Sequence, residues 1–193
     1  MIGRPIGELS VGQTAELTRT VTRQMISDFA GTVGDHNPLH ADPAFARSVK
    51  FEEPIAPGVL TAGLISAAIG TLLPGPGTLY LSQELKFRRP VYPGDTITAR
   101  VEVTELMPQR NRVKLSTVCL NQDGEDVLVG EAWVKPPKQR VEYAETPVDE
   151  AGVPTAMTMA TSALQLWTGL AHATLSYWQP PDGRPTNGEP SAT

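Results

Sequence analysis

The chain has 193 residues, enough for one well-buried domain, and its 40% hydrophobic and 19% charged residues are typical of a globular protein rather than a disordered one. Its formal net charge of -5, with no block of Lys and Arg, argues against a nucleic-acid-binding protein. Because Cys119 is the only cysteine, the chain cannot form an intramolecular disulfide or a thiolate metal cluster, and we interpret this residue as core filling.

The first predicted elements are a strand and a helix. Residues 13–21 alternate loosely between polar and apolar, as in a strand. Thr22 is a good N-cap for the helix that follows, and Gly34 can end that helix because glycine accepts the left-handed conformation after a last turn. The apolar residues between them recur at helical spacing, at Met25, Ile26, Phe29 and Ala30.

Two further helices are predicted after the loop that begins at Asp35. Asp42 and Pro43 cap and start a short helix over residues 44–48. The next apolar segment, residues 59–73, carries apolar side chains on every face, so we expect a helix that is buried on all sides. It is shorter than the ~20 residues that span a bilayer. The N-terminus also lacks the apolar stretch of a signal peptide, and we therefore expect a cytoplasmic protein.

Four strand-like runs follow, and short turns such as the one at Asp123-Gly124 separate them. Together with the first strand and the apolar helix, they predict an α+β fold in which an antiparallel sheet of about five strands curls around one long helix. These runs cover residues 78–88, 96–106, 113–121 and 127–135.

The character of the chain changes after the last strand. We expect the main domain to cover residues 1–136 and a polar, Pro-containing linker to cover residues 137–155. Residues 156–178 have the apolar spacing of an amphipathic helix, and residues 179–193 are rich in Pro and polar residues, as in a disordered tail.

The most informative segment is the hexapeptide Asp35-His36-Asn37-Pro38-Leu39-His40, which holds two of the three histidines of the chain. It places a carboxylate and an imidazole five positions apart, a pairing suited to proton transfer. A metal site formed by its two histidines is disfavoured, because Pro38 breaks the helical face that such ligands need. The alternative is an ordinary turn, since Asp and Asn-Pro favour turns whatever the function.

The hexapeptide and the segments after it resemble the MaoC-like, (R)-specific enoyl-CoA hydratases. The similarity covers roughly residues 8 to 136, and several separate motifs occur in the same order. Besides the hexapeptide, the matching segments are Asp42-Pro43-Ala44-Phe45-Ala46, Phe51 to Gly58, Ser82 to Phe87 and Pro90 to Asp95.

The resemblance implies a hotdog fold, a homodimer, and hydration of trans-2-enoyl-CoA to (R)-3-hydroxyacyl-CoA, with no cofactor beyond the coenzyme A that the substrate carries. It assigns the catalytic pair to Asp35 and His40 rather than to His36. It also implies a minor supporting role for Ser66 near the site. The supporting loop residues are Asn37 and Pro38.

The chemistry of the residues agrees with this assignment. Adding water to a conjugated double bond needs a base for the water and an acid for C2, and a carboxylate and an imidazole that share one water can supply both without a metal. The charge that develops on the thioester oxygen needs donors, which the free N–H groups at the start of the Gly58 helix can provide. One departure is Pro57, where many relatives carry His, and it leaves the acyl preference open.

Two alternative functions remain open. A hotdog thioesterase would use the same substrate class but would direct the water at the thioester carbonyl. A non-catalytic acyl-binding or interaction module would act through the C-terminal helix. That helix bears a faint resemblance to phasins, which coat polyhydroxyalkanoate granules, so a granule or protein partner is one candidate and docking on its own dimer is another.

Overall fold

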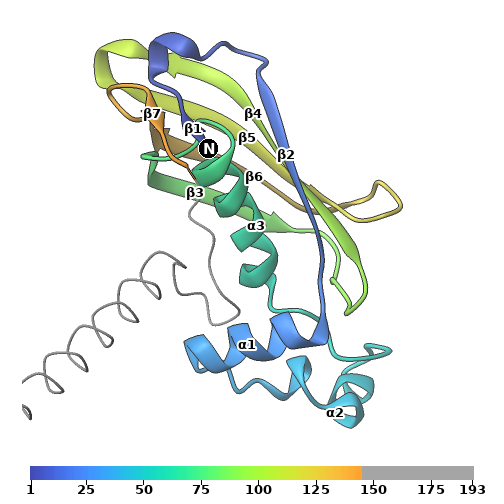
Figure 1. The fold of residues 1–193 in the computed structure, drawn as a ribbon. Helices are drawn as coiled ribbons and strands as arrows, with labels where there is room; N and C mark the ends of the chain where they lie inside the picture. Colours follow the sequence, from blue (N-terminus) through green and yellow to red (C-terminus); the bar gives the residue numbers. More distant parts are fainter. Residues whose placement is uncertain (145–193) are drawn as a thin grey trace, which may run out of the picture. The chain divides into compact units, whose positions relative to one another are not determined.

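A five-stranded antiparallel sheet is the frame of the computed structural model, which describes residues 1–144 (Figure 1). Each strand pairs antiparallel with its neighbours, and the long strands curve together. This arrangement confirms the predicted curled sheet and its five strands. In spatial order they are β2 (Thr14–Thr20), β4 (Thr96–Met107), β5 (Arg112–Leu120), β6 (Asp126–Lys135) and β3 (Leu79–Phe87).

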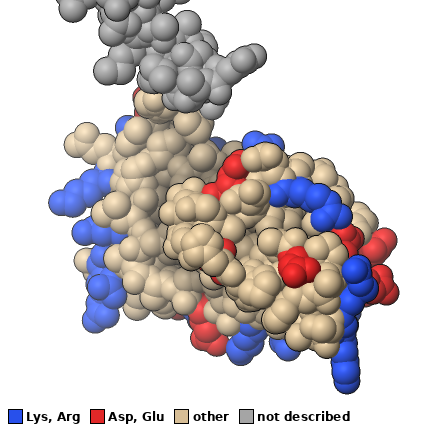
Figure 2. Space-filling model, turned by 90° about the horizontal axis from the view of Figure 1, so that it is seen from below, with Lys and Arg blue, Asp and Glu red and all other residues tan. Residues whose placement is uncertain are grey.

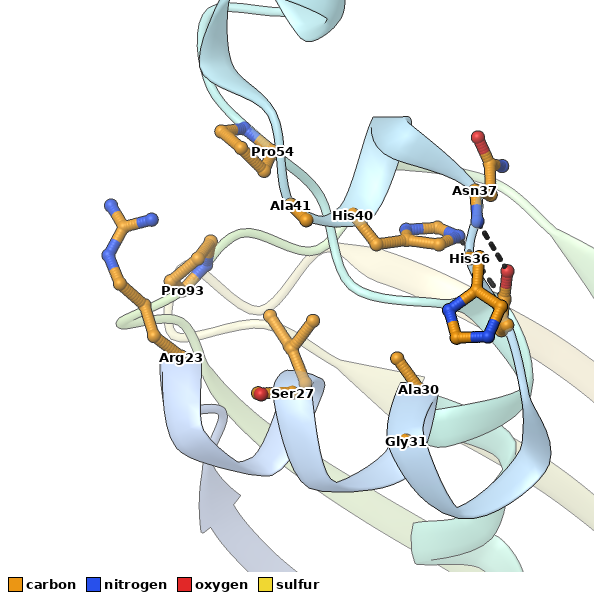
Figure 3. A pocket seen from close by; sticks show the side chains of 12 residues that line it. Arg23, Ser27, Ala30, Gly31, His36, Asn37, His40, Ala41, Pro54 and Pro93 are labelled. Carbon is orange, nitrogen blue, oxygen red and sulfur yellow. Dashed lines mark hydrogen bonds and ion pairs between the residues drawn. The ribbon is translucent and has the colours of Figure 1, made fainter.

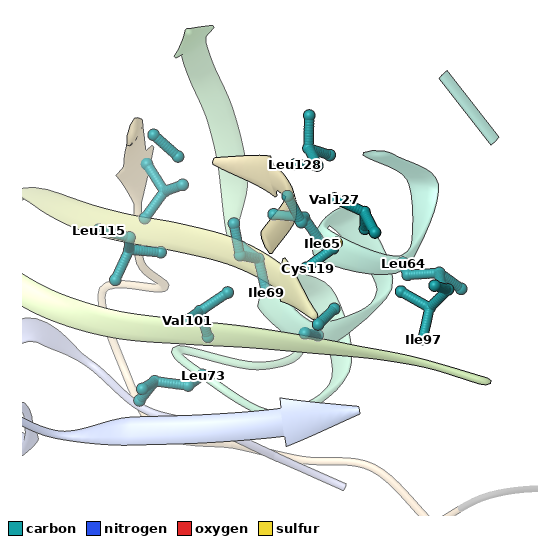
Figure 4. Packing of buried hydrophobic residues seen from close by; sticks show 14 of the residues in the cluster. Leu64, Ile65, Ile69, Leu73, Ile97, Val101, Leu115, Cys119, Val127 and Leu128 are labelled. Atoms are coloured by element: carbon teal, nitrogen blue, oxygen red, sulfur yellow. The ribbon is translucent and has the colours of Figure 1, made fainter. Parts of the chain in front are cut away.

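Helix α3 (Gly58–Thr71) packs against this sheet, with its main contacts to β2, β4 and β5 (Figure 1). The alternating inward residues of the strands meet the apolar residues of the helix, which gives the α+β core that the sequence predicts. Figure 4 shows this packing around Ile65 and Ile69 of the helix. Fully buried members of the core include Ile65, Ile69, Leu73, Ile97, Val101, Leu115 and Leu128.

The expectation that this helix is buried on all sides is wrong. Val59 is 63% exposed, and Gly63 and Ser66, one and two turns further along, are exposed as well. The sheet covers the helix from one side only, so the opposite stripe, which carries small residues, stays open. Apolar residues on every face of a helix therefore do not show that every face is buried.

The other two α-helices, α1 and α2, precede α3 and lie at its N-terminal end (Figure 1). α1 (Arg23–Val33) begins at Thr22, whose hydroxyl accepts the Met25 N–H at 3.1 Å, and ends at Gly34 with a φ of 73°. Asp42 caps α2 (Pro43–Ser48), as predicted. No helix within residues 1–144 is long and apolar enough to cross a membrane. The described residues also form three short 3-10 helices: η1 (Ile6–Glu8), η2 (Pro38–His40) and η3 (Pro108–Arg110).

Two short strands join the start of the chain to residues that the sequence predicts as linker. β1 (Ile2–Gly3) pairs with β7 (Val141–Glu142), and the N-terminal amino group donates to the Tyr143 carbonyl at 2.7 Å. The first compact unit accordingly extends to Ala144. The rest of the predicted linker, the predicted helix 156–178 and the predicted tail 179–193 lie outside the described residues.

The core makes a quantitative prediction about stability. Ile65 is 1% exposed, so truncation to Ala removes buried methyl groups and leaves a cavity between α3 and the sheet. We expect Ile65→Ala to lower the free energy of unfolding by about 2–5 kcal/mol in urea titrations. Val11→Ala is the control, because Val11 is 64% exposed, and an equal loss in the two variants would contradict the described core.

Candidate active site

Asp35 is held at the end of α1 by the backbone around it. Gly34 turns the chain in the left-handed conformation, and the Asp35 N–H then donates to the Ala30 carbonyl at 2.9 Å. One carboxylate oxygen, Oδ1, accepts the Asn37 N–H at 3.1 Å (Figure 3). This hydrogen bond fixes the carboxylate and leaves its second oxygen, Oδ2, directed toward His40.

His40 is the last residue of η2, the short 3-10 helix inside the predicted loop. The Asn37 side chain caps η2 by accepting the Leu39 N–H at 3.1 Å, and Pro38 occupies its first position. The His40 Nδ1 lies 2.8 Å from the Ile55 carbonyl oxygen. Because a carbonyl oxygen only accepts, Nδ1 carries the hydrogen, and in the neutral form of the ring Nε2 is an acceptor.

The two acceptors of the pair face each other across a gap. His40 Nε2 lies 3.7 Å from Asp35 Oδ2, which is too long for a direct hydrogen bond. A single water can bridge the gap by donating one hydrogen to each acceptor. The His40 side chain is 11% exposed and the Asp35 side chain 33%, so the imidazole is shielded from solvent while the carboxylate stays accessible. The geometry thus suits one activated water.

A cavity of about 530 Å³ contains this pair (Figure 3). Figure 2 looks onto the end that carries α1 and α2, where the surface is hollowed between mostly uncharged side chains with charged groups at the edges. One wall of the cavity is a face of α1, on which residues 23, 27, 30 and 31 recur at helical spacing. The sequence did not predict this wall, although the spacing is visible in it. The lining residues are Arg23, Ile26, Ser27, Ala30, Gly31, Asp35, His36, Asn37, His40, Ala41, Pro54 and Pro93.

Gly58 lies at the first position of α3 and lines a second cavity of about 280 Å³. The segment before Gly58 contacts both sites: the Ile55 carbonyl accepts the hydrogen bond from His40, and Ile55 also lines the second cavity. The N–H groups of Gly58 and Val59 have no acceptor among the described residues, as expected at a helix start. Pro57 as N-cap leaves these donors available.

A side chain at residue 58 would displace either the Phe87 ring or the start of α3. A Cβ atom on residue 58 would lie 2.7 Å from Phe87 Cε1, which is closer than real Cβ atoms come to a neighbour, and 3.0 Å from Cδ1. The aromatic ring at the end of β3 therefore packs on the bare Cα of Gly58. The contact between Phe87 and Gly58 could not be predicted from the sequence, because α3 and most of β3 lie between the two residues in the chain.

The structure places the other predicted site residues less centrally. His36 is exposed and lines the first cavity, where Figure 3 shows it beside Asn37. Ser66 lies about two turns after Gly58 on the exposed stripe of α3 and lines neither cavity. Residues 1–144 contain no group of three or more His, Cys, Asp or Glu side chains arranged to bind a metal ion.

Cys119 lies in the core beneath the second cavity's wall rather than in a reactive setting. Burial raises the pKa of its thiol to about 12, and Sγ is 3.8 Å from the Thr61 carbonyl oxygen. Because the thiolate is the reactive form, we expect iodoacetamide at pH 8 to leave the native chain unmodified and to alkylate it once in denaturing urea. Mass spectrometry reads out both results, and rapid alkylation of the native chain would contradict this placement.

Comparison with known proteins identifies close relatives. A family model described as MaoC-like domain matches residues 8–124. The 3-hydroxybutyryl-CoA dehydratase of Methylorubrum extorquens is 48% identical over 132 residues, which covers 68% of this chain and 83% of the relative. The (R)-specific enoyl-CoA hydratase of Rhodospirillum rubrum is 45% identical over 130 residues, which covers 67% of this chain and 90% of the relative.

Solved structures give the same result for the fold. The unliganded R-hydratase PhaJ1 from Pseudomonas aeruginosa has a TM-score of 0.70 and 46% identity, covering 77% of this chain and 97% of that one. The (R)-hydratase from Aeromonas caviae, described as involved in PHA biosynthesis, has a TM-score of 0.65 and 45% identity, covering 67% of this chain and 98% of that one. The described fold is therefore the hotdog fold of these hydratases.

Proposed function

The chain belongs to the MaoC-like domain family, and we propose that it is an (R)-specific enoyl-CoA hydratase in which Asp35 and His40 activate one water. The observation that carries the proposal is the 3.7 Å gap between two acceptors, each of which is oriented by a separate hydrogen bond. Hydratase and dehydratase activities are the two directions of one reaction, which agrees with the names of the relatives.

The proposed step is the addition of water across the C2–C3 double bond of the enoyl thioester. The oxygen of the bridging water attacks C3 while one of its protons passes to the Asp35–His40 pair. The π electrons move toward the thioester, and the pair then returns the proton to C2. The water thus supplies both the hydroxyl group and the new hydrogen, and the pair ends in its starting protonation state.

Stabilisation of the intermediate charge is assigned to the start of α3. The thioester oxygen gains negative charge as C3 is attacked, and the Gly58 N–H, which has no acceptor among the described residues, is the donor that we assign to it. The positive end of the helix adds to this effect. The positions of Asn37 and Pro38 support a role in holding His40, whereas we retain Ser66 only as a minor contributor on the exposed stripe of α3.

Crotonyl-CoA separates hydration from the thioesterase alternative. We expect the purified full chain to remove the enoyl-thioester absorbance without releasing free thiol, since the pair is assigned to attack at C3. Release of thiol in proportion to substrate loss would favour the thioesterase. Absence of turnover on enoyl-CoAs of every acyl length would favour the non-catalytic module.

We also propose that the protein forms a homodimer through β3. This strand lies at one edge of the sheet and exposes Leu79 and Leu81, while Val59 is exposed on α3. An edge strand can pair with its own copy about a two-fold axis, which would cover these apolar side chains. Sedimentation velocity at micromolar concentration should give twice the mass of the chain, and a monomer would contradict the proposal.

Some expectations from the sequence stay predictions. These are the cytoplasmic location, the absence of a cofactor beyond the coenzyme A of the substrate, and a granule or protein partner for the C-terminal helix. That helix lies outside the described residues. A variant that ends at Ala144, the end of the compact unit, would separate the activity of the main domain from any role of the C-terminal segment.

A further inference from the structure

The second cavity is lined by apolar residues and by two arginines. Phe51, Phe87 and Pro90 line it together with Gly58, whose N–H has no acceptor among the described residues. Arg88 and Arg89 line the same cavity directly after β3. A cavity that combines a backbone donor, apolar side chains and a cation offers matching partners for a thioester carbonyl, a pantetheine arm and a phosphate group.

The two arginines differ in what already binds them. The Arg89 guanidinium donates to the Asp126 carbonyl at 2.9 Å and forms an ion pair with Glu125 at 3.2 Å. Arg88 is exposed, and its side chain has no hydrogen-bond or ion-pair partner among the described residues. Its backbone N–H donates to the Val127 carbonyl at 2.9 Å, which anchors the residue at the rim. Arg88 is thus the cation of the pair that is open to a ligand.

Neighbouring charges strengthen this distinction. Lys86, two residues earlier, has an ion pair with Glu84 at 3.4 Å, so it is partly neutralised. The chain as a whole carries a net charge of -5, which repels a polyanion, so attraction at this cavity has to come from a local cation such as Arg88, which has no partner among the described residues. A guanidinium binds phosphate oxygens well because its planar fork can donate two hydrogen bonds.

We propose that Arg88 binds a phosphate group of the coenzyme A part of the substrate while the pantetheine arm occupies the Gly58 cavity. This inference rests on the proposed hydratase function and deepens it, because it makes the nucleotide part of the thioester a determinant of recognition. Arg88 acts in substrate binding and takes no part in the proton transfers at Asp35 and His40.

The test compares two thioesters of the same acyl group. Crotonyl-CoA carries phosphates, whereas crotonyl-N-acetylcysteamine ends before the first phosphate. We expect Arg88→Ala to raise the KM for crotonyl-CoA about tenfold, the size of one lost charge-assisted hydrogen bond, and to leave kcat/KM for the short thioester within about twofold. Arg88→Lys should recover part of the loss. Arg89→Ala is the matched control and should change the KM less, since Arg89 is held by Glu125 and Asp126.

Salt dependence gives a second readout. The KM of the wild-type chain for crotonyl-CoA should rise with ionic strength, and this dependence should weaken in Arg88→Ala, because salt screens an exposed charge pair. Equal effects of Arg88→Ala on both thioesters, or no effect on either, would overturn the inference while hydration by the wild type stands. If the wild type hydrates neither thioester, the proposed function fails and the inference fails with it.

Discussion

Replacing Asp35 with Asn is expected to lower kcat for hydration of crotonyl-CoA by at least about 100-fold, the usual range for loss of general acid–base catalysis. The Asn side chain has nearly the same shape, and its oxygen can still accept the Asn37 N–H at the position of Oδ1. Its amide nitrogen would then face His40 Nε2 in place of Oδ2. A donor at that position cannot accept a hydrogen from the bridging water.

The controls for this variant separate catalysis from folding. Circular dichroism and the urea midpoint of Asp35→Asn should match those of the wild type, because the backbone hydrogen bonds at the end of α1 are kept. Asp28→Asn makes the same chemical change on the same helix, where Asp28 accepts a hydrogen bond from Gln24 at 2.7 Å and lines neither cavity. A loss of less than about fivefold in a folded Asp35→Asn variant would contradict the role of the pair.

Replacing Gly58 with Ala is expected to lower kcat by about 100-fold or more, since misplacing one oxyanion donor costs 10²–10³ in rate. The added Cβ would lie 2.7 Å from Phe87 Cε1, so either the ring or the start of α3 must shift. A shift of the helix start moves the N–H away from the thioester oxygen. The measurement is the steady-state rate with crotonyl-CoA, and kcat should fall more than KM rises.

A double variant distinguishes the contact from other effects of the methyl group. Phe87→Ala removes the atoms that the new Cβ would meet, so Gly58→Ala should cost less rate in the Phe87→Ala background than in the wild type. Gly7→Ala is the control, because a Cβ at residue 7 would have no neighbour within 4 Å. Equal costs in the two backgrounds would show that Phe87 does not determine the need for glycine.

Much of the fold could be predicted because local signals agree with one another. Thr22 and Gly34 bound α1 as cap residues, and Asp42 caps α2, so short-range chemistry places these ends. The alternation in β4 and β5 matches burial on the inner face of the sheet. The pairing of β1 with β7 was not predicted, since each strand has only two residues and the partners lie at opposite ends of the compact unit.

The site could be predicted where its residues are close to one another in the sequence. The hexapeptide places Asp35 and His40 close together, and the structure brings them to 3.7 Å. The hydrogen-bond partner that determines the tautomer of His40 could not be inferred from the sequence. It is the main-chain carbonyl of Ile55, and every residue has such a carbonyl. The exposed stripe of α3 was missed for a related reason: hydrophobicity does not tell which side of a helix the sheet reaches.

The measurement that tests the central claim most directly follows the oxygen of the water. Crotonyl-CoA is incubated with the full chain in ¹⁸O-labelled water, and the product is analysed by mass spectrometry and by a chiral assay. Attack at C3 by the water held between Asp35 and His40 predicts (R)-3-hydroxybutyryl-CoA with the label on its C3 hydroxyl group. Label in a free carboxylate together with released coenzyme A, or a product of the opposite configuration, would contradict the account.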